Sequence, residues 1–157
     1  MNSIVNAMRG FPKPLFYLGL FLLLPSCSMM FTSPTDQTIV DSHELEKEGD
    51  LLLEKGNLQM ANEHYEVALK LRQNDPVLIF KKGLVSLAAN RNEDALKEFV
   101  KAVSLDPQLA LAHDGIGQVF FRKNEPDKSL EAFHEALRLD PSLWKTWNLM
   151  GLLYDHQ

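Results

Sequence analysis

Four glycines recur at one fixed interval along this chain: Gly49, Gly83, Gly117 and Gly151 are equally spaced. Four other kinds of residue recur at the same interval. They are a small residue, an aromatic residue, a second small residue and a proline. These columns are Ala61, Ala95 and Ser129; Tyr65, Phe99 and Phe133; Ala68, Ala102 and Ala136; and Pro107 and Pro141. A period of about 34 residues indicates one supersecondary unit that repeats and buries its apolar face only against neighbouring copies. We therefore expect a stack of repeated units.

Each unit reads as a pair of helices. The expected ranges are 42–55 and 58–73, 77–89 and 93–105, 109–122 and 126–139, with a seventh helix that begins near Ser142 as its N-cap. Pro107 and Pro141 end the second helices, because proline lacks the N–H and clashes with the preceding turn. Small residues such as Gly83 and Ala95 allow the two helices of one hairpin to approach closely, and the aromatic column fills space between hairpins. The predicted fold class is all-α.

The last unit adds a more specific signature. Trp147, Met150, Gly151 and Tyr154 match the pattern W-x2-L-G-x2-Y with Met in place of Leu. This signature and the order glycine, alanine, aromatic, alanine and proline together make residues 42–157 resemble the tetratricopeptide repeat family. That resemblance implies a right-handed α-solenoid of antiparallel helix hairpins. Its units would cover residues 42–75, 76–109 and 110–143, with a partial fourth unit or capping helix at 144–157.

In this family the first helix of each hairpin lines a concave groove that binds a peptide or protein ligand. Carried over by repeat position, the groove residues are Phe80, Lys81, Leu84, Leu87, Leu111, Asp114, Gln118, Phe121 and Arg122. For each of them, ordinary packing between repeats remains the alternative. Chaperone-binding members hold a carboxylate with basic and amide side chains, whereas Glu46 and Asp50 occupy the matching places here. Both would repel a carboxylate, so we exclude that specialisation.

Other function classes find little support. The chain has one cysteine, which excludes an intramolecular disulfide and a cysteine metal cluster. Its five histidines form no H-E-x-x-H pattern, and neither a G-x-S-x-G elbow nor a phosphate-binding loop is present. The net charge of −5 argues against nucleic acid as a partner. We expect no enzyme activity, no metal and no cofactor.

The segment 1–26 reads as a signal peptide. Arg9 and Lys13 precede the uncharged stretch LFYLGLFLLL, which is too short to span a bilayer as a helix. The sequence Leu-Pro-Ser-Cys that follows resembles the bacterial lipobox, which implies that Cys27 is acylated and that residues 27–41 form a tether, irregular over 28–40. A plain signal peptide with an incidental cysteine and an uncleaved anchor remain alternatives. Either Met1 or Met8 is the start.

Ser28, where some lipoproteins have Asp, favours the periplasmic face of a bacterial outer membrane, with secretion to the periplasm as the alternative. The predicted function is a lipid-anchored interaction scaffold that helps assemble an envelope complex such as a pilus or a secretion system. The chain resembles tetratricopeptide lipoproteins of pilus assembly, the Flp pilus and type IV pilus pilotin groups. The alternative is a structural or oligomerisation subunit that acts through the C-terminal helix. Trp147, Leu152 and Tyr154 make that helix apolar on several sides, a mark of association.

Overall fold

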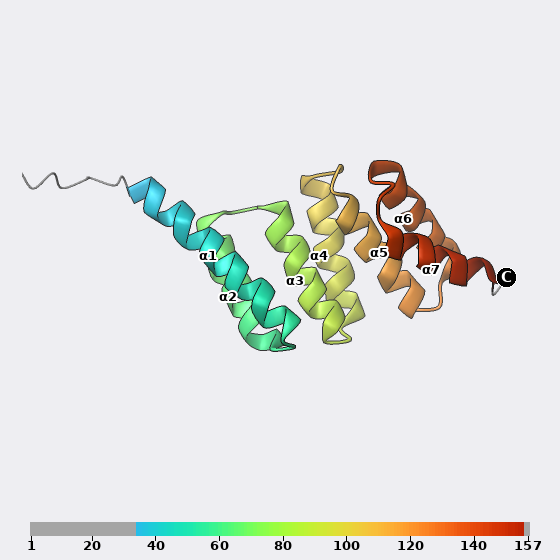
Figure 1. Cartoon of the computed structure of the whole chain (residues 1–157), viewed down its shortest axis with the longest axis horizontal. Coiled ribbons are helices and arrows are strands. Elements are labelled where there is room, and N and C mark those ends of the chain that lie inside the picture. The colour runs from blue at the N-terminus through green and yellow to red at the C-terminus, as the bar shows by residue number, and fades with distance from the viewer. Residues whose placement is uncertain (1–33, 156–157) are drawn as a thin grey trace, which may run out of the picture. The chain divides into compact units, whose positions relative to one another are not determined.

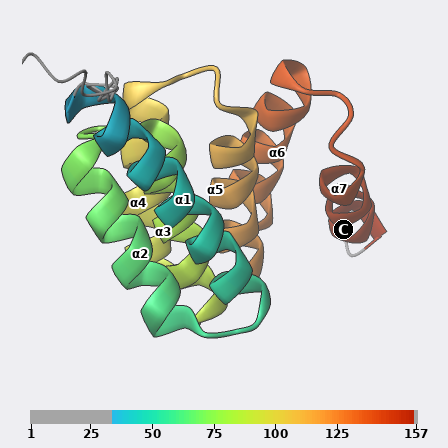
Figure 2. The same ribbon diagram turned by 60° about the vertical axis from the view of Figure 1, so that its left-hand side comes forward.

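The computed structural model describes residues 34–155, which form seven α-helices and no strand. They are α1 (Pro34–Glu54), α2 (Leu58–Leu71), α3 (Pro76–Ala88), α4 (Asn92–Leu105), α5 (Ala110–Arg122), α6 (Pro126–Leu139) and α7 (Trp144–Asp155). Helices α1 to α6 pair into three hairpins that follow one another in chain order, and α7 packs beside α6 (Figure 1; Figure 2 shows the same stack turned). The all-α prediction is confirmed. None of the described helices is long and apolar enough to cross a lipid bilayer.

Two helix starts differ from the expectation. Helix α1 begins at Pro34 instead of residue 42, so residues 34–40, predicted to be irregular, are helical. Proline fits the first turn of a helix, and neither glycine nor another proline follows before Gly49. Helix α7 begins at Trp144, so Ser142 is not its N-cap. The backbone N–H and the hydroxyl of Ser142 instead both donate to Oδ1 of Asp140, at 2.9 and 2.6 Å, in the turn before the helix.

The turn inside each hairpin has the same backbone conformation three times. Gly56, Asn90 and Asn124 follow the first helix of each pair and have positive φ angles of 75°, 59° and 58°. Glycine and asparagine tolerate this left-handed region best. At α3, Asn90 N donates to the carbonyl of Leu87 at 3.1 Å, and the next amide donates to Ser86 at 2.9 Å. These bonds satisfy carbonyls at the helix end and reverse the chain direction.

Glycines of the first helices receive aromatic rings from the second helices. A Cβ built on Gly83 would lie 2.5 Å from Cε1 of Phe99, and one on Gly49 would lie 2.6 Å from Cε1 of Tyr65. Gly117 stands in the same relation to Phe133. All three rings are fully buried. The glycine column therefore exists because each ring occupies the volume that a side chain on the facing helix would need.

The rings also join one hairpin to the next, as the sequence predicts. Phe99 lies against Gly83 in its own hairpin and against Gly115 in α5, where a Cβ would come within 2.8 Å of the ring. Phe133 packs with Leu137 of its own helix and with Met150 and Leu153 of α7. The interior is consequently a row of small clusters in which each unit relies on its neighbours, as in other repeat proteins.

The same substitution at two repeat positions has opposite expected effects. Gly83→Ala forces its methyl group into the Phe99 ring, and we expect the free energy of unfolding to fall by about 1–3 kcal/mol. Gly151→Ala introduces its methyl group where nothing lies within 4 Å, and the better helix former should raise that free energy by up to about 1 kcal/mol. Urea unfolding followed by far-UV circular dichroism measures both. Equal effects at the two positions would contradict the packing described here.

Candidate functional site

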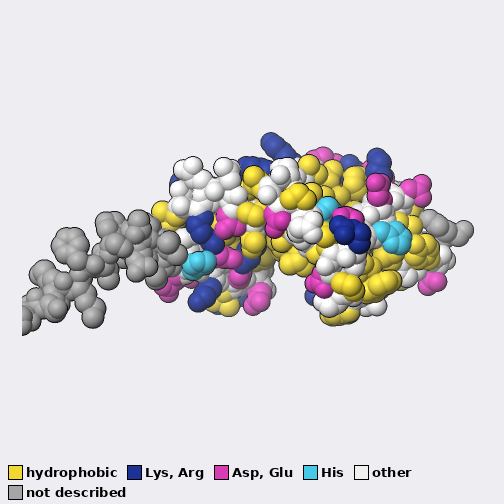
Figure 3. Space-filling model, turned by 90° about the horizontal axis from the view of Figure 1, so that it is seen from above, with side chains coloured by type: hydrophobic (Ala, Val, Ile, Leu, Met, Phe, Trp, Pro, Cys, Tyr) yellow, Lys and Arg dark blue, Asp and Glu magenta, His cyan; other side chains and the backbone are white. Residues whose placement is uncertain are grey.

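The predicted ligand residues belong to α3 and α5, and we call the side of the odd helices α1, α3, α5 and α7 that carries Val77, Leu111 and Leu152 the odd-helix face. Several large apolar side chains of the odd helices are exposed, among them Leu51 of α1 and one residue on each of α3, α5 and α7. Val77 of α3 is 39% exposed, Leu111 of α5 44% and Leu152 of α7 49%. Leu84 and Phe121 are half-buried. Figure 3 shows hydrophobic side chains among charged ones toward the N-terminal hairpin and in larger patches toward the C-terminal end.

Two predicted ligand residues are core residues. Phe80 is 7% exposed and Leu87 is 4% exposed, and both pack in the cluster around Phe99. The Phe80 and Phe99 ring centroids lie 5.7 Å apart at a tilted angle. The prediction that these two side chains line an open ligand surface is therefore wrong. The face is less apolar than the sequence suggested, because α3 turns both toward the neighbouring hairpin.

Lys81, a third predicted ligand residue, is held by α1. Its Nζ lies 2.6 Å from Oε1 of Glu46 and 2.7 Å from Oδ2 of Asp50. The other oxygen of Asp50 accepts a hydrogen bond from the Tyr65 hydroxyl at 2.7 Å. The acidic flank predicted for the first unit thus pairs with a cation of the second unit and with the ring that rests on Gly49. Lys81 is therefore already paired with two carboxylates of its own chain.

Arg72, between α2 and α3, completes this N-terminal charge network. Its guanidinium bonds Glu46, donates to the buried Ser42 hydroxyl at 2.7 Å, and lies 3.0 Å from Asp75. Burial by itself would raise the pKa of Glu46, but hydrogen bonds and charges from Lys81 and Arg72 outweigh it and lower that pKa. The pKa of Lys81 is raised, since the two carboxylates overcome the opposite effect of burial.

The remaining odd helices are joined by polar contacts as well. Asp114 of α5 accepts from Gln118 Nε2 at 2.7 Å and from Thr146 Oγ1 of α7 at 2.6 Å. Arg122, at the end of α5, donates to the carbonyl of Leu87 at 2.6 Å and so satisfies a carbonyl near the end of α3. Of the predicted ligand residues, Asp114, Gln118 and Arg122 therefore fix helix to helix. Leu111 is the one with a side chain that is both exposed and apolar.

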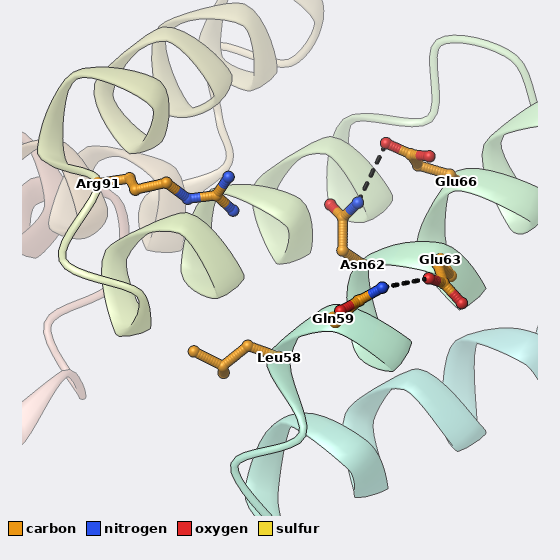
Figure 4. A pocket seen from close by; sticks show the side chains of 6 residues that line it. All are labelled: Leu58, Gln59, Asn62, Glu63, Glu66 and Arg91. Carbon is orange, nitrogen blue, oxygen red and sulfur yellow. Dashed lines mark hydrogen bonds between the residues drawn. The ribbon is translucent and has the colours of Figure 1, made fainter.

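A separate surface hollow of about 480 Å³ lies on the other side of the hairpins. Four polar side chains of α2 and Leu58 line it, and Arg91 reaches in from the turn before α4 (Figure 4). Asn62 donates to Glu66 at 3.1 Å and Gln59 to Glu63 at 3.2 Å, so much of the lining is bonded to itself. None of the predicted site residues lies here. Among the described residues, no group of three or more His, Cys, Asp or Glu side chains is placed to bind a metal ion.

Helix α7 keeps the repeat signature but not its packing. Trp147 is 54% exposed and Tyr154 is 52% exposed, and no atom lies within 4 Å of a Cβ built on Gly151. The repeat signature led us to expect these three as packing residues, but within residues 34–155 no further helix packs over them. The expected exposed apolar surface of this helix is confirmed.

Sequence reasoning missed the contacts that fasten the helices to one another. Ser42 and Arg72 are 30 positions apart, and Thr146 and Asp114 are 32 apart. None of these four residues belongs to a column that recurs from unit to unit, so the period gave no signal for them. The one available signal was local: Arg72 directly follows the end of α2, where a cation can reach back over the first hairpin.

Comparison with known proteins supports the repeat assignment. Residues 80–143 match the family model described as tetratricopeptide repeat. The chain is 32% identical over 89 residues to the TPR repeat-containing thioredoxin TTL4 of Arabidopsis thaliana, which covers 57% of this chain and 13% of that protein. It is 27% identical over 99 residues to the Hsp70-Hsp90 organizing protein 1 of Glycine max, 63% of this chain and 17% of that protein. The chain thus spans less than a fifth of either relative.

Solved structures share the fold. The Arabidopsis OM64 TPR domain superposes with a TM-score of 0.70 at 18% identity, over 76% of this chain and 99% of that domain. The first TPR domain of Spaghetti (RPAP3), solved with the HSP90 peptide SRMEEVD, gives a TM-score of 0.68 at 16% identity over 74% of this chain and 93% of that chain. The described residues therefore have the all-α fold of tetratricopeptide-repeat domains.

Replacing one carboxylate tests the N-terminal charge network. Because the folded-state pKa of Glu46 lies below its ordinary value of 4.5, its carboxylate stabilises the fold above that pH. This stabilisation disappears as the pH falls through the lowered pKa. We expect Glu46→Gln to reduce the free energy of unfolding by about 1–3 kcal/mol at pH 7. The difference from the wild type should vanish below the folded-state pKa.

Urea unfolding across an acid-to-neutral pH series measures this difference. Glu44→Gln is the matched control, because Glu44 is an exposed carboxylate of the same helix. Its effect should stay within about 0.5 kcal/mol at every pH. A Glu46→Gln deficit that persists unchanged in acid would show that the network does not depend on this charge.

Proposed function

We propose that this chain, whose fold is that of the tetratricopeptide-repeat solenoids, is an interaction scaffold that binds a segment of a partner protein on its odd-helix face and catalyses no reaction. The observation that carries the proposal is the placement of Val77, Leu111 and Leu152. Each is a large, exposed, apolar side chain, and they stand on three successive odd helices. Side chains of this kind, fixed on rigid elements, anchor peptide ligands.

Polar contacts hold these anchors in place before any ligand arrives. Lys81 ties α3 to α1, Arg122 ties α5 to α3, and Thr146 ties α7 to α5. A surface whose helices are already fixed loses less conformational entropy on binding than a mobile one. The side chains of Leu84 and Phe121 are half-buried and add apolar surface to the same helices as Val77 and Leu111. The fitting ligand is therefore an extended or helical segment with apolar side chains spaced to reach neighbouring helices.

The charge of the first hairpin limits which ligands fit. The first domain of RPAP3 was solved with a peptide that ends in Glu-Glu-Val-Asp. On this chain, Glu46 and Asp50 stand on the face of α1 and already share Lys81 between them. An acidic chain terminus would meet these two carboxylates, which already hold Lys81 between them. We therefore propose an uncharged or basic segment as the ligand.

A photo-crosslinking amino acid placed at one residue tests which face binds. With the probe at Leu111 in the full chain, expressed in its native cells, we expect a discrete covalent adduct with a second protein after irradiation. The matched control carries the probe at Val100 of α4, an apolar side chain that is 51% exposed but lies on an even helix. An adduct of equal yield at Val100, or none at Leu111, would exclude the odd-helix face as the binding surface.

We also propose that Cys27 carries acyl chains and anchors the scaffold at the periplasmic face of a bacterial outer membrane. Cys27 lies outside the residues that the structure describes, so the support is the sequence: Arg9 and Lys13, the apolar stretch LFYLGLFLLL and Leu-Pro-Ser-Cys. Several acyl chains on one residue give stable attachment, whereas one chain gives marginal binding. Secretion into the periplasm without lipid is the alternative.

Metabolic labelling with a palmitate analogue tests the anchor. We expect the wild-type chain to become labelled and Cys27→Ala to lose the label. Ser26→Ala is the matched control, because it keeps a small residue before an intact cysteine and should retain the label. An unlabelled wild type, or a label that survives in Cys27→Ala, would rule out lipidation at this residue.

An anchored binding module suits a role in building an envelope complex, such as a pilus or a secretion system. The support is the combination of a lipoprotein-like N-terminus with a protein-binding fold. In that role the anchor raises the local concentration of the scaffold at the membrane, where its partners assemble. The identity of the protein crosslinked through Leu111 tests this role, since a partner from outside the envelope would overturn it.

A further inference from the structure

Helix α7 presents a second apolar surface that the odd-helix face does not include. Trp144, Trp147 and Tyr154 are 64%, 54% and 52% exposed, and Gly151 lies between the last two. Their spacing of three, four and three positions places them along one side of the helix. We call these four residues the open α7 face. Tryptophan and tyrosine are the side chains most enriched where proteins bind one another.

The structure shows what covers this surface at the equivalent positions of the first three units. Gly49, Gly83 and Gly117 each receive an aromatic ring from the following helix. In each case a small residue four positions before the ring and another three positions after it are fully buried: Ala61 and Ala68, Ala95 and Ala102, Ser129 and Ala136. One helix pattern, small-x3-aromatic-x2-small, therefore fills the same surface three times. Gly151 has the same place in the period and has nothing within 4 Å.

The opposite side of α7 fixes the orientation of this surface. Met150 and Leu153 are buried against Phe133 and Leu137 of α6, and Thr146 bonds Asp114. Two aromatic side chains of the open face are also positioned from behind. Trp147 Nε1 donates to the carbonyl of Pro141 at 3.1 Å, and His134 Nε2 lies 3.2 Å from the Tyr154 hydroxyl. The open α7 face is thus preorganised, with glycine leaving room for a ring between ordered aromatic walls.

We propose that the open α7 face binds an amphipathic helix of a partner protein that seats one aromatic ring on Gly151, with small residues four positions before and three after that ring. The described helices of a second folded copy of this chain do not supply such a helix. Its own three helices with this pattern, α2, α4 and α6, have their rings fully buried in their own hairpins. Helix α7 lacks the pattern, because Trp147 has Leu143 before it and Met150 after it at these spacings.

A peptide that copies α6 provides the probe, since α6 carries the pattern in Ser129, Phe133 and Ala136. The peptide spans residues 124–141, is blocked at both ends and carries a fluorescent label. Titration with the purified full chain should give saturable anisotropy and a gain in helical circular dichroism, because a free helix of this length is marginal in water. A Phe133→Ala version of the peptide should bind at least about tenfold more weakly.

Gly151→Leu in the full chain separates binding from folding. Leucine fills the ring position and should weaken the peptide at least about tenfold. At an exposed helical site with nothing within 4 Å, it should leave the thermal unfolding midpoint unchanged or raise it. Lys97→Leu is the matched control, because it adds an exposed leucine on α4, outside the open α7 face, and should keep wild-type affinity.

Three results would overturn the proposal. They are the absence of saturable binding to the wild-type chain, equal affinity for Gly151→Leu and wild type, and self-association of the full chain that Gly151→Leu abolishes in sedimentation velocity. The last would identify a second copy as the occupant. None of these three results affects the outcome of the Leu111 crosslinking experiment. The proposals for the open α7 face and for the odd-helix face are therefore tested independently.

Discussion

The contact between an aromatic ring and a facing glycine determines most of this structure. Each of the three rings occupies space that any other residue on the first helix would claim, so the two helices of a hairpin have one compatible register. Phe99 lies against glycines of two hairpins at once and therefore also fixes the step from one unit to the next. The constant spacing of glycines and aromatic residues along the chain is the sequence record of this repeated steric requirement.

Because ring contacts hold the hairpins from within, the outer side of the odd helices is available for other chemistry. Here most of it serves to join neighbouring odd helices, through Lys81, Arg122 and Asp114. Charged side chains that pair inside the chain do not attract ligands of opposite charge. In the proposed binding mode, the ligand therefore contacts the exposed apolar residues of this side, and the paired carboxylates disfavour acidic ligands.

Features that recur were predictable from the sequence, and features that occur once were not. The helices, the glycine and aromatic columns and the turns at Asn90 and Asn124 recur from one unit to the next. Each unit therefore supports the assignment made in the others. The network of Ser42, Arg72 and Glu46 occurs once and joins residues far apart in sequence. Nor could the sequence tell Phe80, which is buried, from Leu111, which is exposed, because both are apolar residues on the first helix of a hairpin.

The same ring-and-glycine contact gives α7 a different role from the other odd helices. Inside the stack the contact is satisfied within the chain and contributes stability alone. On α7 the glycine and its aromatic neighbours are formed and oriented, and no ring from residues 34–155 fills the position. Under our proposal, the geometry that defines the fold becomes a criterion for choosing a partner. Leu152 and Gly151 are adjacent in sequence and point to different sides of the helix. In our two proposals, one short helix therefore contributes to two binding surfaces, each with its own side chains.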